Sequence, residues 1–104
     1  MGADGLSKLS SARVAVFGVG GVGGYVVEAL ARVGIGSLDI VDHDTVSESN
    51  INRQLCATYS TVGKYKVDVF AARIADINPG ANVRTYKVFF SPETAREGFR
   101  LILW

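Results

Sequence analysis

Two sets of residues in the chain have the types and the spacing needed to bind a nucleotide. The first is a glycine-rich run, Gly18-Val19-Gly20-Gly21-Val22-Gly23, which fits the pattern GxGxxG. In this pattern the first glycine permits a tight turn, the second lets the backbone approach a phosphate, and the third lets a helix pack closely on a strand. Free N–H groups at the start of the following helix would then form an anion site.

The second set is polar and begins at Asp42, which follows an apolar run. An acid at this place in a nucleotide-binding fold accepts hydrogen bonds from ribose hydroxyls. Up to this point the residues indicate only a nucleotide, and an NAD-dependent oxidoreductase and an ATP-dependent enzyme stay equally open. The residues that follow add carboxylates, amides and cations at close spacing, namely Asp44, Asn50, Arg53, Gln54 and Lys66.

Short apolar runs predict the strands that must position these residues. Residues 13–17 form an apolar run that ends at a glycine, which is typical of a buried strand, and 38–41 form a second run of this kind. Residues 83–90 are expected to supply a third strand. The apolar residues 101–104 suggest a fourth.

Apolar residues at helical spacing predict the connections between the strands. Between Val22 and Val33 they recur on one face of a helix, and Gly34 stands where a C-cap glycine belongs. Thr61 is expected to cap a second long helix that ends at 78–80, and a short helix is expected after Ser91. The alternation predicts an α/β fold, a Rossmann-like parallel sheet with helices on both faces.

The composition is that of a packed globular domain. The chain has 104 residues, of which 48% are hydrophobic and 20% charged, whereas disorder would need fewer apolar residues. A formal net charge of +1 argues neither for nor against a nucleic-acid partner. The single cysteine, Cys56, excludes an internal disulfide framework and is expected to be an ordinary half-buried thiol. No apolar run approaches the roughly 20 residues of a membrane span, so we expect a cytoplasmic protein without a membrane partner.

The polar residues continue into a longer pattern that resembles a known family. The residues from Asp42 to Gln54 read D-x-D-x-V-x-x-S-N-x-x-R-Q, and G-x-x-K follows from Gly63 to Lys66. Together with the glycine run, in this order, they resemble the ubiquitin-activating-enzyme superfamily with its bacterial ThiF/MoeB-like members. The resemblance is strongest over residues 11–95, and we expect 1–104 to be part of an ATP-binding adenylation domain.

This resemblance implies the N-terminal part of a domain that binds ATP and Mg²⁺, adenylates a carboxylate and releases pyrophosphate. The glycine run would cradle the nucleotide and Asp42 would hold the ribose. Asp44 would lie near the metal or its water shell, and no residue is assigned as a direct metal ligand.

The remaining polar residues would bind the phosphates or order the loop around them. The resemblance implies that Arg53 and Lys66 contact the phosphates, while Asn50 and Gln54 help to order the site. Physical chemistry agrees, because adenylation brings an anionic carboxylate against an anionic α-phosphate, and fixed cations in a dry cleft reduce that repulsion. Arg53 offers a planar fork of donors, whereas Lys66 offers a point charge.

Five short segments indicate one branch of the family. They are most similar to tRNA threonylcarbamoyladenosine dehydratases, in which ATP activates a carboxylate on tRNA. The segments are residues 28–36, 52–55, 61–67, 77–79 and 88–93. Adenylyltransferases that act on the C-terminus of a small sulfur-carrier protein are the near alternative. The partner is therefore expected to be tRNA or such a carrier.

Two further expectations concern assembly and completeness. Family members dimerise through this domain, so the resemblance implies a homodimer, and a non-catalytic dimerisation module stays open as a function. The family's arginine from an N-terminal segment is not recognisable before Ser11, and its later aspartate and substrate-binding half would lie beyond Trp104. We therefore expect that the chain does not complete the reaction alone.

Overall fold

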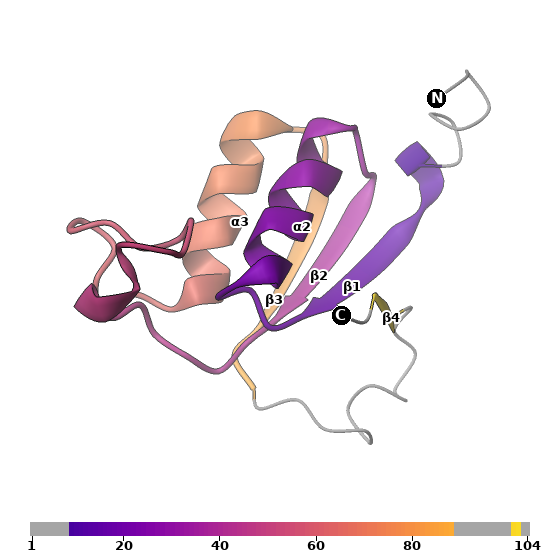
Figure 1. The fold of residues 1–104 in the computed structure, drawn as a ribbon. Coiled ribbons are helices and arrows are strands. Elements are labelled where there is room, and N and C mark those ends of the chain that lie inside the picture. The colour runs from indigo at the N-terminus through magenta and orange to yellow at the C-terminus, as the bar shows by residue number, and fades with distance from the viewer. Residues whose placement is uncertain (1–8, 89–100, 103–104) are drawn as a thin grey trace.

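The chain folds around a four-stranded parallel sheet covered by two helices (Figure 1). The computed structural model describes residues 9–88 and 101–102. The strand order is β3-β2-β1-β4, and all neighbouring strands are parallel. Along the chain the elements are β1 (Arg13–Phe17), α2 (Val22–Arg32), β2 (Ser37–Val41), the 3₁₀ turn η1 (Glu48–Asn50), α3 (Lys66–Ile77), β3 (Asn82–Tyr86) and β4 (Leu101–Ile102).

The register of the strands brings three loops to one edge of the sheet. The last residues of the first three strands are paired, because Phe17 lies beside Val41 and Val41 beside Tyr86. Just past these ends, the Gly18 N–H donates to the Val41 carbonyl at 2.8 Å, and the Asp42 N–H donates to the Tyr86 carbonyl at 3.1 Å. The glycine run and the polar run therefore start side by side at the carboxyl ends of the strands, where α/β sheets bind ligands.

Both described helices cover the same face of the sheet (Figure 1). The core between the layers consists of alternate strand residues and the inner faces of the helices: Val16, Leu38, Ile40, Val27, Ala31, Val67, Phe70 and Ile74. Consecutive right-handed crossovers in one direction place their helices on one side. Arg73 of α3 also hydrogen-bonds to Glu28 of α2, which joins the two helices.

The second face of the sheet carries its own small apolar cluster of Ala15, Phe17 and Val41, with Tyr86 packed against it. Helices were predicted on both faces, and the described helices lie on only one of them. The strand order places β3 and β4 at opposite edges of the sheet. The connection between them includes residues 89–100, which lie outside the described residues, as does the predicted helix after Ser91.

Most predicted elements are confirmed, with two boundaries corrected. The second helix does not begin at Thr61 but at Lys66. The Thr61 hydroxyl instead donates to the Cys56 carbonyl at 2.6 Å, and Gly63 adopts a positive φ of 88° that interrupts helical geometry. The third strand was predicted to reach 90 but ends at Tyr86; residues 89–90 are not described. Of the fourth strand, Leu101 and Ile102 pair with β1.

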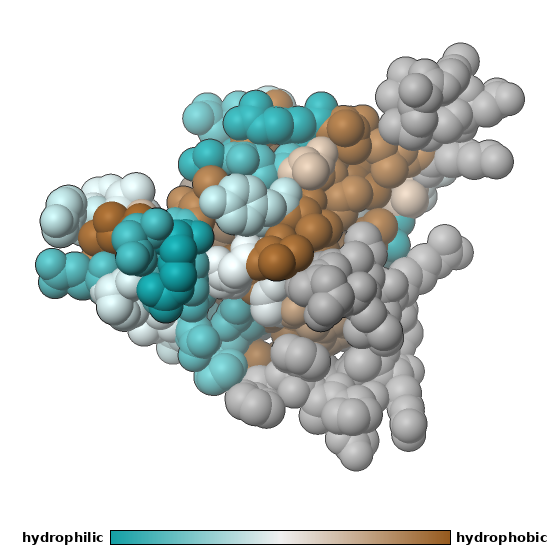
Figure 2. All heavy atoms as spheres, viewed as in Figure 1, coloured by the Kyte–Doolittle hydropathy of each residue, from teal (hydrophilic) through white to brown (hydrophobic). Residues whose placement is uncertain are grey.

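Several apolar residues of α2 and its C-cap are exposed to solvent. Val22 is 62% exposed, and Tyr25 and Val33 are also exposed. Figure 2 shows hydrophobic residues gathered along α2, while the surface over the loop that carries η1 is mostly hydrophilic. Neither of the described helices is long and apolar enough to cross a membrane.

Candidate nucleotide-binding site

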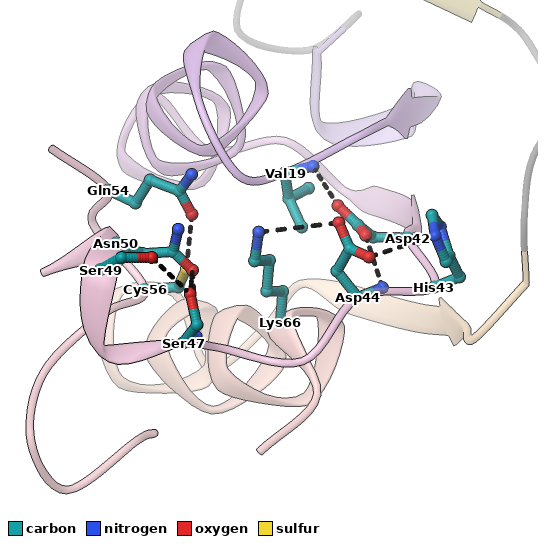
Figure 3. A network of polar contacts seen from close by, with 10 residues as sticks. All are labelled: Val19, Asp42, His43, Asp44, Ser47, Ser49, Asn50, Gln54, Cys56 and Lys66. Atoms are coloured by element: carbon teal, nitrogen blue, oxygen red, sulfur yellow. Dashed lines mark hydrogen bonds and ion pairs between the residues drawn. The ribbon is translucent and has the colours of Figure 1, made fainter. Parts of the chain in front are cut away.

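The carboxylate of Asp42 joins the glycine run to the polar run. One of its oxygens accepts the Val19 N–H at 2.9 Å, and the other accepts the Asp44 N–H at 2.8 Å (Figure 3). Asp42 is only 8% exposed. A charged acceptor makes both bonds stronger than bonds between neutral groups, so this carboxylate holds the two segments together.

Lys66 reaches the same place from the first turn of α3. Its backbone N–H donates to the Asp44 carbonyl at 3.1 Å, and its Nζ lies 3.9 Å from an Asp44 carboxylate oxygen (Figure 3). The Lys66 side chain is 8% exposed, whereas that of Asp44 is 54% exposed. A buried ammonium with one distant, solvated partner retains a strong preference for a further anion.

Gly20 lies against both Lys66 and Gln54. A Cβ built on Gly20 would lie 3.1 Å from the Lys66 Nζ and 3.3 Å from each polar atom of the Gln54 amide. The absence of a side chain at Gly20 therefore lets a cation and an amide approach the backbone of the glycine run. A cation and an amide thus converge on the backbone of the glycine run, and both are groups that bind phosphate oxygens.

Asn50 orders the polar loop. Its side-chain oxygen accepts both the Ser47 N–H at 3.0 Å and the Ser47 hydroxyl at 2.9 Å, and η1 begins at this capping box. The Gln54 N–H then donates to the Asn50 carbonyl at 2.9 Å. Asn50 is buried, so it acts on the site by holding the turn that presents Gln54.

Arg53 lies apart from this cluster. Its guanidinium donates to the Ser49 carbonyl at 2.9 Å and to the Asn52 side chain at 3.3 Å, on the exposed side of the turn. Within residues 9–88 it thus pairs with its own turn and not with the glycine run. It lines an open hollow of about 210 Å³ together with Tyr25 and Gln54. Lys66 and Arg53 were predicted to act together, and the structure brings only Lys66 to Gly20.

The glycines divide into turn, cap and packing positions. Gly18 has a positive φ of 85°, which the turn after β1 requires. Gly21 is the N-cap of α2, and Gly23 is buried in its first turn. Gly24 was not among the predicted site residues, and a Cβ there would lie 2.7 Å from the Phe70 ring and 2.8 Å from the Val19 carbonyl. The only available signal was a second glycine beside Gly23, at a position where a helix favours alanine.

Asp42, His43 and Asp44 each offer a metal-ligating atom, and these atoms lie within 4.8 Å of one another. Carboxylate oxygens are the ligands that Mg²⁺ prefers. Both Asp42 oxygens already accept backbone N–H groups, and Asp44 is the solvent-exposed carboxylate of the three. Asp44 is thus the residue that fits a position beside Mg²⁺ or its water shell.

Cys56 is buried beside this site, and its Sγ lies 3.8 Å from the Gln54 side-chain oxygen. Burial raises the pKa of the Cys56 thiol, although the nearby charge of Lys66 opposes that effect. Because the thiolate is the nucleophilic form, a raised pKa makes Cys56 a packing residue and not a nucleophile.

Comparisons with known proteins identify the family. A match to the ThiF family spans residues 1–102. The chain is 52% identical over 99 residues to the tRNA threonylcarbamoyladenosine dehydratase of Bacillus subtilis, covering 95% of this chain and 39% of that protein. It is 39% identical over 100 residues to the adenylyltransferase and sulfurtransferase uba4 of Aspergillus clavatus, covering 96% of this chain and 20% of that protein.

Solved structures show the same fold. The crystal structure of the Escherichia coli tRNA N6-threonylcarbamoyladenosine dehydratase in complex with ATP matches with a TM-score of 0.88 at 39% identity, covering 94% of this chain and 42% of that chain. The chain therefore spans about two-fifths of the length of such relatives and has their Rossmann-like architecture. With the family match over 1–102 and the glycine run, Asp42 and Lys66 at one edge of the sheet, this chain belongs to the ThiF family.

Proposed function

We propose that the chain binds ATP with Mg²⁺ and takes part in the adenylation of a carboxylate. The observation that carries this proposal is the approach of the buried Lys66 ammonium and the Gln54 amide to the backbone of Gly20. Support also comes from one relative, the Escherichia coli tRNA N6-threonylcarbamoyladenosine dehydratase, which was crystallised both in complex with ATP and in complex with AMP. No comparable support favours NAD.

The residues at the site suit this reaction. Lys66 would neutralise negative charge on the phosphates, and its burial makes that interaction stronger than it would be in water. The first turn of α2 adds free N–H groups at the end of a helix dipole. Asp44 would hold Mg²⁺ or its water shell, where the ion supplies charge neutralisation for the phosphates. Arg53 would reach a phosphate by exchanging its bond to the Ser49 carbonyl.

We further propose that the carboxylate belongs to threonylcarbamoyladenosine in tRNA, so that adenylation leads to cyclisation with loss of water. The 52% identity to the Bacillus subtilis enzyme of that name supports this substrate. A sulfur-carrier protein is the second candidate, supported by the 39% identity to uba4. A tRNA substrate would place the protein in the cytoplasm.

Assembly and completeness form part of the same proposal. We propose that residues 1–104 supply the ATP-binding part of an adenylation domain and that the reaction also needs residues outside this chain, since the chain spans 39% of the length of that relative. We also propose a homodimer, which the exposed apolar side chains of Val22, Tyr25 and Val33 support. A pyrophosphate-exchange assay on the 104-residue chain should then stay at background.

Thermal unfolding with ATP–Mg²⁺ and with NAD, measured side by side, tests the proposal. A ligand at 100 times its Kd adds about 2.7 kcal/mol of stability, which raises the Tm of a domain of this size by roughly 11–22 °C. We expect that rise with ATP–Mg²⁺ and no comparable rise with NAD. A rise with NAD alone would instead support an oxidoreductase.

A further inference from the structure

We propose that the contact between Gly24 and Phe70 is a positioning contact, which sets how closely α2 and α3 approach each other beside the proposed ATP site. The inference rests on the proposed function and adds two residues that act through Lys66 and do not themselves touch the nucleotide. The two helices lie side by side on one face of the sheet (Figure 1). Because Lys66 is the first residue of α3, a shift of this helix moves the Lys66 ammonium.

Two close approaches join the glycine-rich segment to α3. At Gly20 a Cβ would lie 3.1 Å from the Lys66 Nζ, and at Gly24 it would lie 2.7 Å from the Phe70 ring. Lys66 and Phe70 are four residues apart, and residues at this spacing lie on the same face of a helix. The face of α3 that carries the ammonium therefore rests on the glycine-rich segment one turn further along, through the Phe70 ring.

The contact at Gly24 leaves no free space. Phe70 is fully buried in the core, and a Cβ at position 24 would also lie 2.8 Å from the Val19 carbonyl. Both distances are shorter than van der Waals contact, so a glycine lets the ring reach the α2 backbone. A close-packed core resists a void as well as an added methyl group, and this contact therefore favours one separation of the two helices.

Lys66 depends on that separation for its place. Its side chain is 8% exposed, and its ion pair with the solvent-exposed Asp44 spans 3.9 Å (Figure 3). A pair this long holds the ammonium only weakly, so the backbone of α3 largely determines where it lies. Further from the site, Arg73 of α3 bonds to Glu28 of α2 and ties the helices together. A methyl group at Gly24 would thus displace the first turn of α3 more than the middle of the helix.

Three variants of the 104-residue chain test the proposal. Gly24→Ala overfills the contact, Phe70→Leu opens it, and the double variant exchanges volume between the two positions. Ile74→Val is the matched control, because Ile74 is a buried residue of α3 that lies two turns beyond Lys66. Each variant is titrated calorimetrically with ATP and with inorganic tripolyphosphate, both with Mg²⁺, and its thermal unfolding is measured alongside.

We expect Gly24→Ala to weaken the binding of ATP and of tripolyphosphate by similar factors, about fivefold, because the ammonium moves away from the phosphates. The double variant should recover part of this loss, because leucine lacks the ring atoms nearest to position 24. Ile74→Val should lower only the Tm. Normal affinity in Gly24→Ala, or no recovery in the double variant, would overturn the proposal, because the contact would then serve stability alone.

A double-mutant cycle shows whether the effect passes through Lys66. In the Lys66→Ala background, Gly24→Ala should change the ATP affinity by less than about twofold, because no ammonium is left to displace. An equal loss with and without Lys66 would contradict the proposal, since it would show that the methyl group disturbs the glycine run itself.

A nuclear Overhauser contact between the ε-CH₂ protons of Lys66 and the α protons of Gly20 gives a readout without nucleotide. It should be present in the unsubstituted chain, weaker in Gly24→Ala and partly restored in the double variant. If Gly24→Ala does not fold, Phe70→Leu takes its place; the same weakening is expected there, and an unchanged contact overturns the proposal. If neither ATP nor tripolyphosphate binds the unsubstituted chain, the proposed function fails, while this proton contact still decides whether Gly24 and Phe70 position Lys66.

Discussion

Substitution by alanine should lower ATP affinity at Gly20 and lower the free energy of unfolding at Gly24, four residues further along the chain. At Gly20 an added methyl group would lie 3.1 Å from the Lys66 Nζ and 3.3 Å from the Gln54 amide. Both neighbours are the far ends of flexible side chains, which can shift by a few tenths of an ångström. At Gly24 the methyl group would lie 2.7 Å from the Phe70 ring and 2.8 Å from the Val19 carbonyl. Phe70 is fully buried, so neither of these neighbours can move freely.

The expected magnitudes follow from these contacts. Replacing a glycine by alanine at a compatible backbone position gains about 0.4–1 kcal/mol from the unfolded state. At Gly20 this gain offsets the mild crowding, so the free energy of unfolding should change by less than about 1 kcal/mol. At Gly24 overpacking of a filled core costs about 1–3 kcal/mol, which exceeds the gain. If Lys66 binds phosphate as proposed, the ATP affinity of Gly20→Ala should fall about tenfold or more, because the methyl group displaces the Lys66 ammonium and the Gln54 amide from the glycine run.

Urea unfolding and calorimetric titration with ATP–Mg²⁺ measure the two quantities on each variant. Gly80→Ala is a matched control, because its methyl group would make only an ordinary contact at 3.7 Å, with Asn78. We expect weak ATP binding with normal stability for Gly20→Ala, and low stability for Gly24→Ala. Normal ATP affinity in Gly20→Ala, or increased stability in Gly24→Ala, would refute the reasoning about these close approaches.

Two further substitutions and one labelling experiment test the packing of the helices and of the polar loop. The hydrogen bond from Arg73 lowers the pKa of Glu28 in the folded chain. The Glu28 carboxylate should therefore add at most about 1 kcal/mol of stability above about pH 4.3, and this contribution should be lost as the pH falls through the lower folded pKa. Urea unfolding between pH 6 and pH 3 should show a smaller loss of stability at acid pH in Glu28→Gln than in the unsubstituted chain. Burial raises the pKa of the Cys56 thiol, so its reaction with iodoacetamide at pH 8 should be far slower than that of the urea-unfolded chain, and equal rates would contradict the burial. Thr61→Val removes a hydroxyl that donates to the Cys56 carbonyl, and should lower the free energy of unfolding by about 1 kcal/mol; an unchanged value would show that this bond adds nothing.

Local patterns predicted the strands and helices where local and tertiary preferences agree. The apolar run at 13–17 reproduces β1, because its buried residues follow one another in the sequence. The helical spacing after Val22 predicted α2 but not its buried face: Val22 and Val33 of the predicted apolar stripe are exposed, and the helix instead buries Gly23, Gly24, Val27 and Ala31. The predicted start of α3 was wrong because Thr61 suits both the N-cap of a helix and a turn. Its actual partner, the Cys56 carbonyl, precedes it in the turn, and no helical period shows that bond.

The sequence predicted which residues lie at the candidate site better than it predicted their hydrogen bonds. The family resemblance, which depends on the spacing of these residues, implied that Lys66 and the glycine run would hold the same nucleotide, and the structure brings the Lys66 Nζ close to Gly20. The same spacing could not show that Asp42 accepts two backbone N–H groups, or that the Arg53 guanidinium bonds to its own turn. Such details depend on side-chain rotamers and on contacts between segments far apart in the chain.

The most direct test of the account is calorimetric titration of ATP–Mg²⁺ into three forms of the chain: unsubstituted, Lys66→Ala and Lys64→Ala. Lys64 is an exposed lysine of the same loop and serves as the matched cation control. The account predicts that Lys66→Ala binds ATP at least about tenfold more weakly, because a charge-assisted bond to phosphate is lost, while Lys64→Ala binds normally. Equal ATP affinity in the unsubstituted and Lys66→Ala chains would contradict the proposal that Lys66 contacts the phosphates of the bound nucleotide.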